Sequence, residues 1–201
     1  SGLTTFGGVV SGLTSLTTIT APGGATSIGA DITTTGAQTY GNPVTLATDV
    51  NFSSGSIAFQ STLDGAKAAK IDVGSGSATF TGAVGPLTDF SVFANSMSFG
   101  STVSGTGTAT LAPGVDGASL GLVASVGSTL TLDAATLDKF AGFPTLQLGR
   151  TTGNGAVDAT DWTLKTNTVV RSGSGPISFG ALDGAKSLTV NTSGLTTFGG
   201  V

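Results

Sequence analysis

The sequence predicts an all-β protein folded as a parallel β-helix (β-solenoid) with about 20 residues per coil. Three observations carry this prediction: the composition, short segments in which apolar and polar residues alternate, and aromatic residues that recur roughly every 20 residues. Of the 201 residues, 33 are Gly, only 9% are charged, and all eleven acidic residues are Asp. Thr, Val, Ile and Phe suit strands and Gly, Asn and Asp suit turns, so this balance indicates many short strands joined by tight turns.

The alternating segments lie between runs of turn-forming residues. They comprise residues 15–20, 78–80, 108–111, 128–132 and 187–190. A period of two over a few residues indicates a strand with one buried face. The Asp-Gly pairs that begin at Asp64, Asp116 and Asp183 are expected to supply corners with positive φ.

Two segments are compatible with a helical turn, residues 63–70 and residues 134–140. The second follows Asp133, a residue type suited to an N-cap, and is followed by a Gly. We therefore expect one short helix or loop insertion near residues 133–145, at a corner of the coil.

Internal repeats favour a solenoid over a β-sandwich, the main competitor. The first nine residues, SGLTTFGGV, recur as the last nine, from Ser193 onward. Residues 53–67 (SSGSIAFQSTLDGAK) return as residues 172–186 (SGSGPISFGALDGAK). One coil length also separates Phe59 from Phe80, Phe80 from Phe99, and Phe179 from Phe198.

Stacked at about 4.8 Å per coil, such repeats would place equivalent side chains above one another in continuous core ladders. The chain would then form about ten coils and a rod roughly 50 Å long. We expect residues 1–201 to form a single continuous solenoid segment, an excerpt of a longer repeat array whose open ends need a cover.

Three passages resemble the β-strand repeats of filamentous haemagglutinin-like adhesins of Gram-negative bacteria. They are ITTTGAQTYGNPVTL (32–46), LTLDAATLDKFAGFPTLQLGRTTGNGAVD (130–158) and LDGAKSLTVNTSGLTTFGG (182–200). Together they cover about a third of the chain. This resemblance implies a right-handed parallel β-helix, exported and displayed on the bacterial cell surface or released as a fibre.

Charge and composition argue against several other functions. The formal net charge of -4 and the pI of about 4.3 disfavour nucleic acid and anionic membranes as partners. No apolar run approaches the roughly 20 residues of a membrane span, so we expect no membrane insertion. Without Cys or His the chain lacks thiolate ligands, the commonest metal ligand and the commonest general base. We therefore predict no catalytic residues, no cofactor and no metal site, and the chain is not expected to be an enzyme.

A carbohydrate-binding or carbohydrate-active β-helix is the first alternative. Asp158 and Asp161 are the best candidate pair of carboxylates, and the nearby Trp162 offers a ring on which a sugar could stack. A glycosidase needs two carboxylates about 5 to 10 Å apart. Asp in a Gly-rich segment is more often a turn residue and a lone Trp more often belongs to the core, so we favour the structural interpretation.

An ice-binding solenoid is the second alternative, because Thr-x-Thr pairs recur from Thr18 to Thr168. Their irregular spacing favours ordinary solvent-facing strands instead. The function we predict is a structural or adhesive extracellular module of a surface adhesin or fibre. Its partners would be neighbouring repeats or copies of itself, stacked end to end or side by side, together with surface glycans or the host or biofilm matrix.

Overall fold

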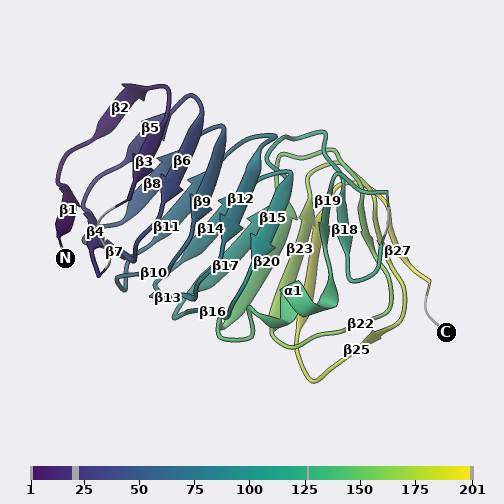
Figure 1. Cartoon of the computed structure of the whole chain (residues 1–201). Helices are drawn as coiled ribbons and strands as arrows, with labels where there is room; N and C mark the ends of the chain where they lie inside the picture. The colour runs from purple at the N-terminus through teal and green to yellow at the C-terminus, as the bar shows by residue number, and fades with distance from the viewer. Residues whose placement is uncertain (1, 20–22, 126, 200–201) are drawn as a thin grey trace.

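A computed structural model describes residues 2–19, 23–125 and 127–199, and it confirms the predicted fold class. The chain is an all-β parallel solenoid whose coils stack from one terminus to the other (Figure 1). Coil length is also confirmed, since Ile57 pairs with Ala78 and Ala78 with Met97, 21 and 19 residues apart. The right-handed sense of the coil stays a prediction.

Each regular coil contributes one strand to each of three sheets. Sheet A contains β1 (Leu3–Phe6), β4 (Ala25–Ile28), β7 (Val44–Leu46), β10 (Leu63–Asp64), β13 (Val84–Leu87) and β16 (Val103–Gly105). Sheet B contains β2 (Val10–Leu13), β5 (Ile32–Thr34), β8 (Val50–Ser53), β11 (Ala69–Asp72), β14 (Phe90–Phe93), β17 (Thr108–Ala112), β20 (Thr145–Arg150), β23 (Asn167–Ser172) and β26 (Leu188–Thr192). Sheet C contains β3 (Leu16–Thr18), β6 (Ala37–Tyr40), β9 (Ser56–Phe59), β12 (Ser77–Phe80) and β15 (Ser96–Phe99).

Two further sheets complete the C-terminal coils. Sheet C′ contains β19 (Leu130–Leu132), β18 (Leu120–Leu122), β21 (Val157–Ala159), β24 (Ile177–Phe179) and β27 (Thr196–Phe198), in that order, and β19 contacts β15 of sheet C. Sheet A′ contains β22 (Trp162–Thr163) and β25 (Leu182–Asp183). Sheet B alone runs through the whole stack with nine strands, so it forms the long spine of the rod (Figure 1).

Aromatic rings form a ladder inside sheet C. Tyr40 stacks on Phe59, Phe59 on Phe80 and Phe80 on Phe99, with ring centroids 4.9, 5.3 and 5.0 Å apart. The strands are parallel and in register, so each ring lies above the equivalent ring of the preceding coil. Phe179 and Phe198 repeat the arrangement in sheet C′, at 5.2 Å. The spacing of about 20 residues between aromatic positions in the sequence therefore corresponds to one coil of the solenoid.

A buried polar pair explains the Gln and Tyr of the ITTTGAQTY passage. Gln38 faces the core, and its Nε2 donates to the carbonyl oxygens of Ile32 and Ser53. Tyr40 donates its hydroxyl to Gln38 Oε1 at 3.0 Å. Every polar atom of this pair thus has a partner, as burial requires.

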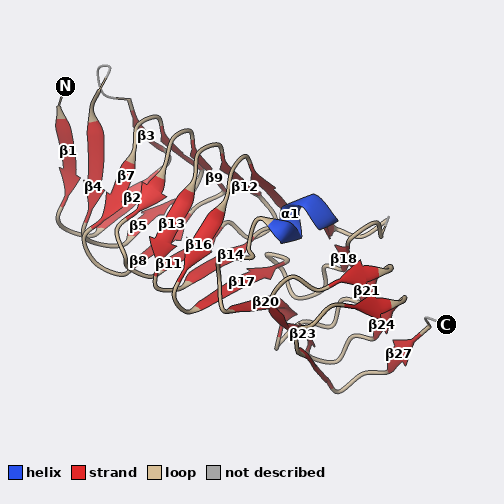
Figure 2. Cartoon of the chain, turned by 90° about the horizontal axis from the view of Figure 1, so that it is seen from below, coloured by secondary structure: helices blue, strands red, loops and turns tan. Residues whose placement is uncertain are grey.

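An insertion interrupts the regular coils after β17. Ala109 pairs with Leu146, 37 residues on, instead of about 20 residues on. Within this insertion the chain forms β18 and then β19, which pairs with β18 in parallel. The helix α1 (Ala134–Asp138) follows and lies at the side of the stack (Figure 2). Asp133 Oδ1 accepts from the backbone N–H of Thr136 at 2.7 Å, as expected of the N-cap. The helix lies in the predicted range, whereas residues 63–70 form strands and a turn instead.

Carboxylate and amide side chains at the coil corners connect one coil to the next. Asp89 Oδ1 accepts from the backbone N–H of Thr108 at 2.7 Å, 19 residues further along the chain. The same contact with the following coil is made by Asp31, Asp49, Asn95, Asp161 and Asn167. Four of the eleven Asp residues, Asp31, Asp49, Asp89 and Asp161, thus satisfy backbone donors of the next coil. Gly65 and Gly184, of the Asp-Gly pairs, adopt positive φ as predicted, but Gly117 does not.

The duplicated nonapeptide occupies two different sheets. In its first copy, Leu3–Phe6 forms β1 of sheet A, where Phe6 pairs with Ile28. In its second copy, Thr196–Phe198 forms β27 of sheet C′, where Phe198 pairs with Phe179. The same nonapeptide therefore forms a strand in two different sheets, because each sheet requires only that inward and outward residues alternate.

Candidate functional sites

The three residues singled out as a sugar site do not converge. Asp158 lies in the middle of β21 and points outward, since its neighbours Val157 and Ala159 face the core. Asp161 lies at the following corner, where its Oδ1 accepts from the backbone N–H of Ala181 at 2.8 Å. Trp162 begins β22 and is only 6% exposed, so its ring packs in the core and offers no free face to a sugar. This geometry does not favour the carbohydrate alternative at these residues.

Asp158 instead anchors a loop. Its Oδ2 accepts from Ser125 at 2.7 Å and its Oδ1 from Ser178 at 2.6 Å. These two hydrogen bonds lower the pKa of the Asp158 carboxyl, because they stabilise its charged form. Gly121, the strand partner of Asp158, leaves the space that the loop fills, since a Cβ there would lie 3.1 Å from Ser125 Oγ.

Threonine pairs do not form one aligned surface. Thr33 lies on sheet B and Thr79 on sheet C, whereas Thr166 and Thr168 are buried. On sheet C, one of the outward positions of each strand forms a row of small, uncharged side chains. This row consists of Thr17, Thr39, Ala58, Thr79 and Ser98. It carries one hydroxyl per coil at most positions, and not the paired threonines on which the ice-binding alternative depends.

Within residues 2–19, 23–125 and 127–199, no three Asp side chains come together as metal ligands. In the same ranges no helix is long and apolar enough to cross a membrane.

The two ends of the stack expose apolar side chains. Phe179 is 2% exposed, whereas Phe198, one coil further in the same ladder, is 60% exposed. At the other end Leu3, Leu13 and Ile19 are also exposed. Each strand at an end of the stack has one neighbour in its sheet. These strands are β1, β2 and β3 at one end and β25, β26 and β27 at the other. Within residues 2–19, 23–125 and 127–199, both end coils therefore present unpaired backbone and uncovered core.

A groove lies on the outer face of sheet B where the extra chain folds back. It encloses about 200 Å³ and is lined by Phe93, Thr110, Gly149, Arg150, Thr151, Thr152 and Arg171. Gly149 lies in its floor beside Arg171, because Gly149 pairs with Arg171 in the adjacent strand. Gly149 has a φ of 88°, and a Cβ there would overlap the carbonyl oxygen of Arg171, so the floor stays open.

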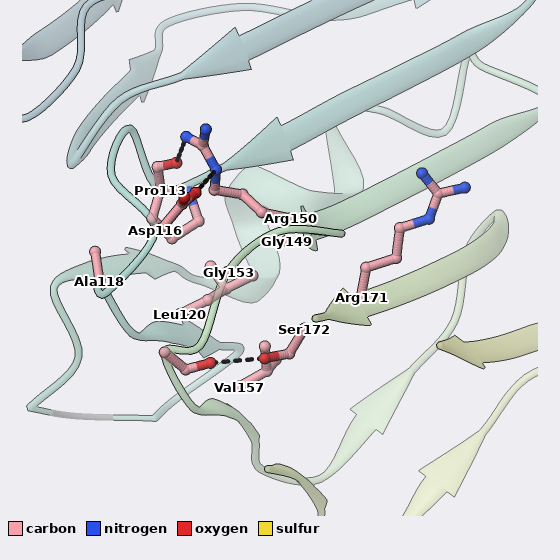
Figure 3. A pocket seen from close by; sticks show the side chains of 11 residues that line it. Pro113, Asp116, Ala118, Leu120, Gly149, Arg150, Gly153, Val157, Arg171 and Ser172 are labelled. Atoms are coloured by element: carbon pink, nitrogen blue, oxygen red, sulfur yellow. Dashed lines mark hydrogen bonds and ion pairs between the residues drawn. The ribbon is translucent and has the colours of Figure 1, made fainter. Parts of the chain in front are cut away.

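Arg150 forms one wall of the groove and is held in place by the inserted loop (Figure 3). Its Nε lies 2.9 Å from Asp116 Oδ1, and its Nη1 donates to the carbonyl oxygens of Pro113 and Gly114. Thr152 also donates to Asp116 Oδ1, at 3.0 Å. The charge of Arg150 is therefore neutralised by Asp116.

Arg171 carries no such partner. Its guanidinium extends from the end of β23 on the other side of Gly149 from Arg150 (Figure 3). The Nε of Arg171 is buried, and within the described part of the chain it has no hydrogen-bond acceptor.

The sequence interpretation missed this groove. Phe93, Arg150 and Arg171 lie far apart in the sequence and meet only because Leu111 pairs with Leu148, 37 residues on. The one available signal was Arg150, which ends the LQLGR strand directly before a turn.

No protein-family model, no curated protein and no solved structure matches this chain. The likeness to adhesin repeats therefore rests on the three sequence passages.

Proposed function

We propose that this chain is a structural and adhesive β-solenoid module of a bacterial surface adhesin or fibre. Its role is to extend a rod by stacking coils, and its end coils associate with further coils, either of the same array or of a second copy. Catalysis is not part of this proposal.

The contrast between Phe179 and Phe198 carries the proposal. Both rings occupy the same ladder: Phe179, which the coil of Phe198 covers, is 2% exposed, whereas Phe198, which no described coil covers, is 60% exposed. Burying a Phe side chain contributes roughly 1.5–3 kcal/mol. A further coil would also pair the open backbone edges of sheets B and C′, which otherwise invite association with other strands.

The sides of the rod support an extracellular setting with neighbours packed alongside. The outward row of sheet C, from Thr17 to Ser98, contains no charge, so two such faces would meet without repulsion. The low overall charge and the absence of Cys are compatible with export to the bacterial surface. The resemblance to haemagglutinin-like repeats supports the same localisation, with surface glycans or a biofilm matrix as partners.

Sedimentation velocity over a range of concentrations tests the stacking. We expect the wild-type chain to form a concentration-dependent series of oligomers. The double variant Leu13→Lys with Phe198→Lys places charge on already exposed end positions, and we expect it to remain monomeric. Val115→Lys is the matched control, because Val115 is 43% exposed but lies in the inserted loop.

Two outcomes would overturn the proposal. One is a wild-type chain that is monomeric at every concentration. The other is a Val115→Lys variant that dissociates the oligomers as effectively as the end variant, which would assign the association to the side of the rod.

A further inference from the structure

We propose that the groove around Arg171 binds the carboxylate of a single acidic sugar unit. This site lies on the outer face of the spine sheet, away from the two ends. Its occupation is independent of whether the rods stack.

The groove has the shape of a built site. Nine strands of sheet B present outward side chains, and at Gly149, within the groove, the side chain is reduced to a hydrogen. The ring of Phe93 closes one end of the depression. A volume of about 200 Å³ lies below the roughly 300–1,000 Å³ of drug-sized pockets, so it suits one sugar ring and not a chain of several.

Electrostatics favour an anion at this position despite the net charge of -4. Lys70 Nζ lies 5.5 Å and Arg150 Cζ 5.3 Å from the ring centroid of Phe93, so two cations flank one end of the groove and Arg171 forms the other. Asp116 is already paired with Arg150. Asp72 lies on the far side of Phe93 and accepts from Gly74 N–H.

Arg171 is the residue that would hold the carboxylate. Arg150 Nε and Nη1 already bond to Asp116, Pro113 and Gly114, whereas the Arg171 side chain has no acceptor or ion pair within the described residues. Because Arg171 Nε is itself buried, a carboxylate in the groove would meet the part of the Arg171 side chain that lines the groove. A guanidinium fork matches a carboxylate through two parallel hydrogen bonds.

Hydroxyl groups along the walls favour a sugar over an acidic peptide. Thr110, Thr151 and Thr152 line the groove; Thr110 and Thr151 can donate to or accept from a ligand hydroxyl, and Thr152, whose hydroxyl donates to Asp116, can accept from one. An acidic side chain would offer the carboxylate without hydroxyls to match these positions.

Titration of the ¹⁵N-labelled chain with glucuronate, followed by NMR, tests the site. We expect saturable shifts of amides in Gly149–Thr152 and Arg171, with no shifts for glucose, the neutral matched sugar. Arg171→Gln should weaken glucuronate binding at least tenfold. Lys165→Gln removes the same charge from an exposed corner and should bind as the wild type does.

Thr110→Phe provides a second test that leaves the charges unchanged, since it fills the groove from its wall. It should also abolish the shifts. The absence of saturable shifts with glucuronate would overturn the proposal, and so would unchanged binding by Arg171→Gln in a folded variant. Equal affinity for acetate or N-acetylaspartate would overturn the assignment to a sugar, because it would show that the carboxylate alone is recognised.

Discussion

The ring of Phe80 stacks on the ring of Phe99 with centroids 5.0 Å apart and planes within 2° of parallel. Both rings come from the same position of successive coils, Phe80 from β12 and Phe99 from β15. Phe80 contacts Phe59 in the same way on its other side, at 5.3 Å. Each ring of this ladder therefore stabilises two coils at once.

Truncation of Phe80 should destabilise the whole stack. Phe80→Ala removes a ring that is 1% exposed and contacts rings above and below, so we expect a loss of roughly 3–5 kcal/mol in the free energy of unfolding. Chemical denaturation measures this loss. Phe80→Leu, which keeps most of the apolar volume, should lose less than half as much, and equal losses for the two variants would contradict the ladder.

The corner carboxylates should be replaceable by amides but not by apolar groups. Asp89→Ala removes the acceptor of the Thr108 N–H, so we expect a cost of about 1 kcal/mol in thermal or chemical unfolding. Asp89→Asn should be nearly neutral, because Asn95 and Asn167 make the same contact with their side-chain oxygens. A large loss in Asp89→Asn would indicate that charge, and not hydrogen bonding, stabilises the corner.

The loop held by Asp158 should loosen in acid. The pKa of Asp158 in the folded chain lies below its ordinary value of 3.8, owing to the hydrogen bonds from Ser178 and Ser125. Its contribution to stability is thus complete above the ordinary value and is lost as the pH falls through the lowered pKa. The difference in unfolding free energy between the wild type and Asp158→Asn should be constant near neutral pH and shrink below about pH 4. The contribution is small because the carboxylate is solvent-exposed. A difference that grows in acid would contradict the assignment.

Two glycines with the same backbone conformation separate strain from steric overlap. Gly127 and Gly149 have φ of 84° and 88°, but a Cβ at Gly127 meets nothing within 4 Å, whereas one at Gly149 overlaps Arg171. Gly127→Ala should cost about 1–2 kcal/mol from the left-handed conformation alone. Gly149→Ala should cost more in the same unfolding measurement, and equal costs would show that the floor of the groove is not sterically constrained.

The regular coils were predictable from the sequence because their determinants are local. Alternating residues define strands, Asp and Gly define corners, and a spacing of 19 or 21 residues, as from Phe59 to Phe80 to Phe99, defines the stacking. The groove was not predictable, because Arg171 reaches Phe93 only through an irregular coil of 37 residues. The sequence left Trp162 open as a candidate sugar platform beside the favoured core interpretation, because the corner before β22 decides which face the indole takes; the indole turns inward.

The cysteine-free sequence allows a direct test of end-to-end stacking, the central claim of this account. Thr17 of β3 and Thr197 of β27 are exposed, outward residues on the two end strands of the same face. If the first coil of one copy stacks on the last coil of another at about 4.8 Å, cysteines at these positions fall within the Cα separation that a disulfide requires.

The measurement is oxidation of the double variant Thr17→Cys with Thr197→Cys, followed by non-reducing gel electrophoresis. The account predicts a ladder of disulfide-linked multimers. The matched control, Thr39→Cys with Ser178→Cys, lies one coil inward from each end and should stay monomeric, because Thr39 pairs with Thr17 and Ser178 with Thr197. Monomers only from the end variant, or equal ladders from both variants, would contradict end-to-end stacking.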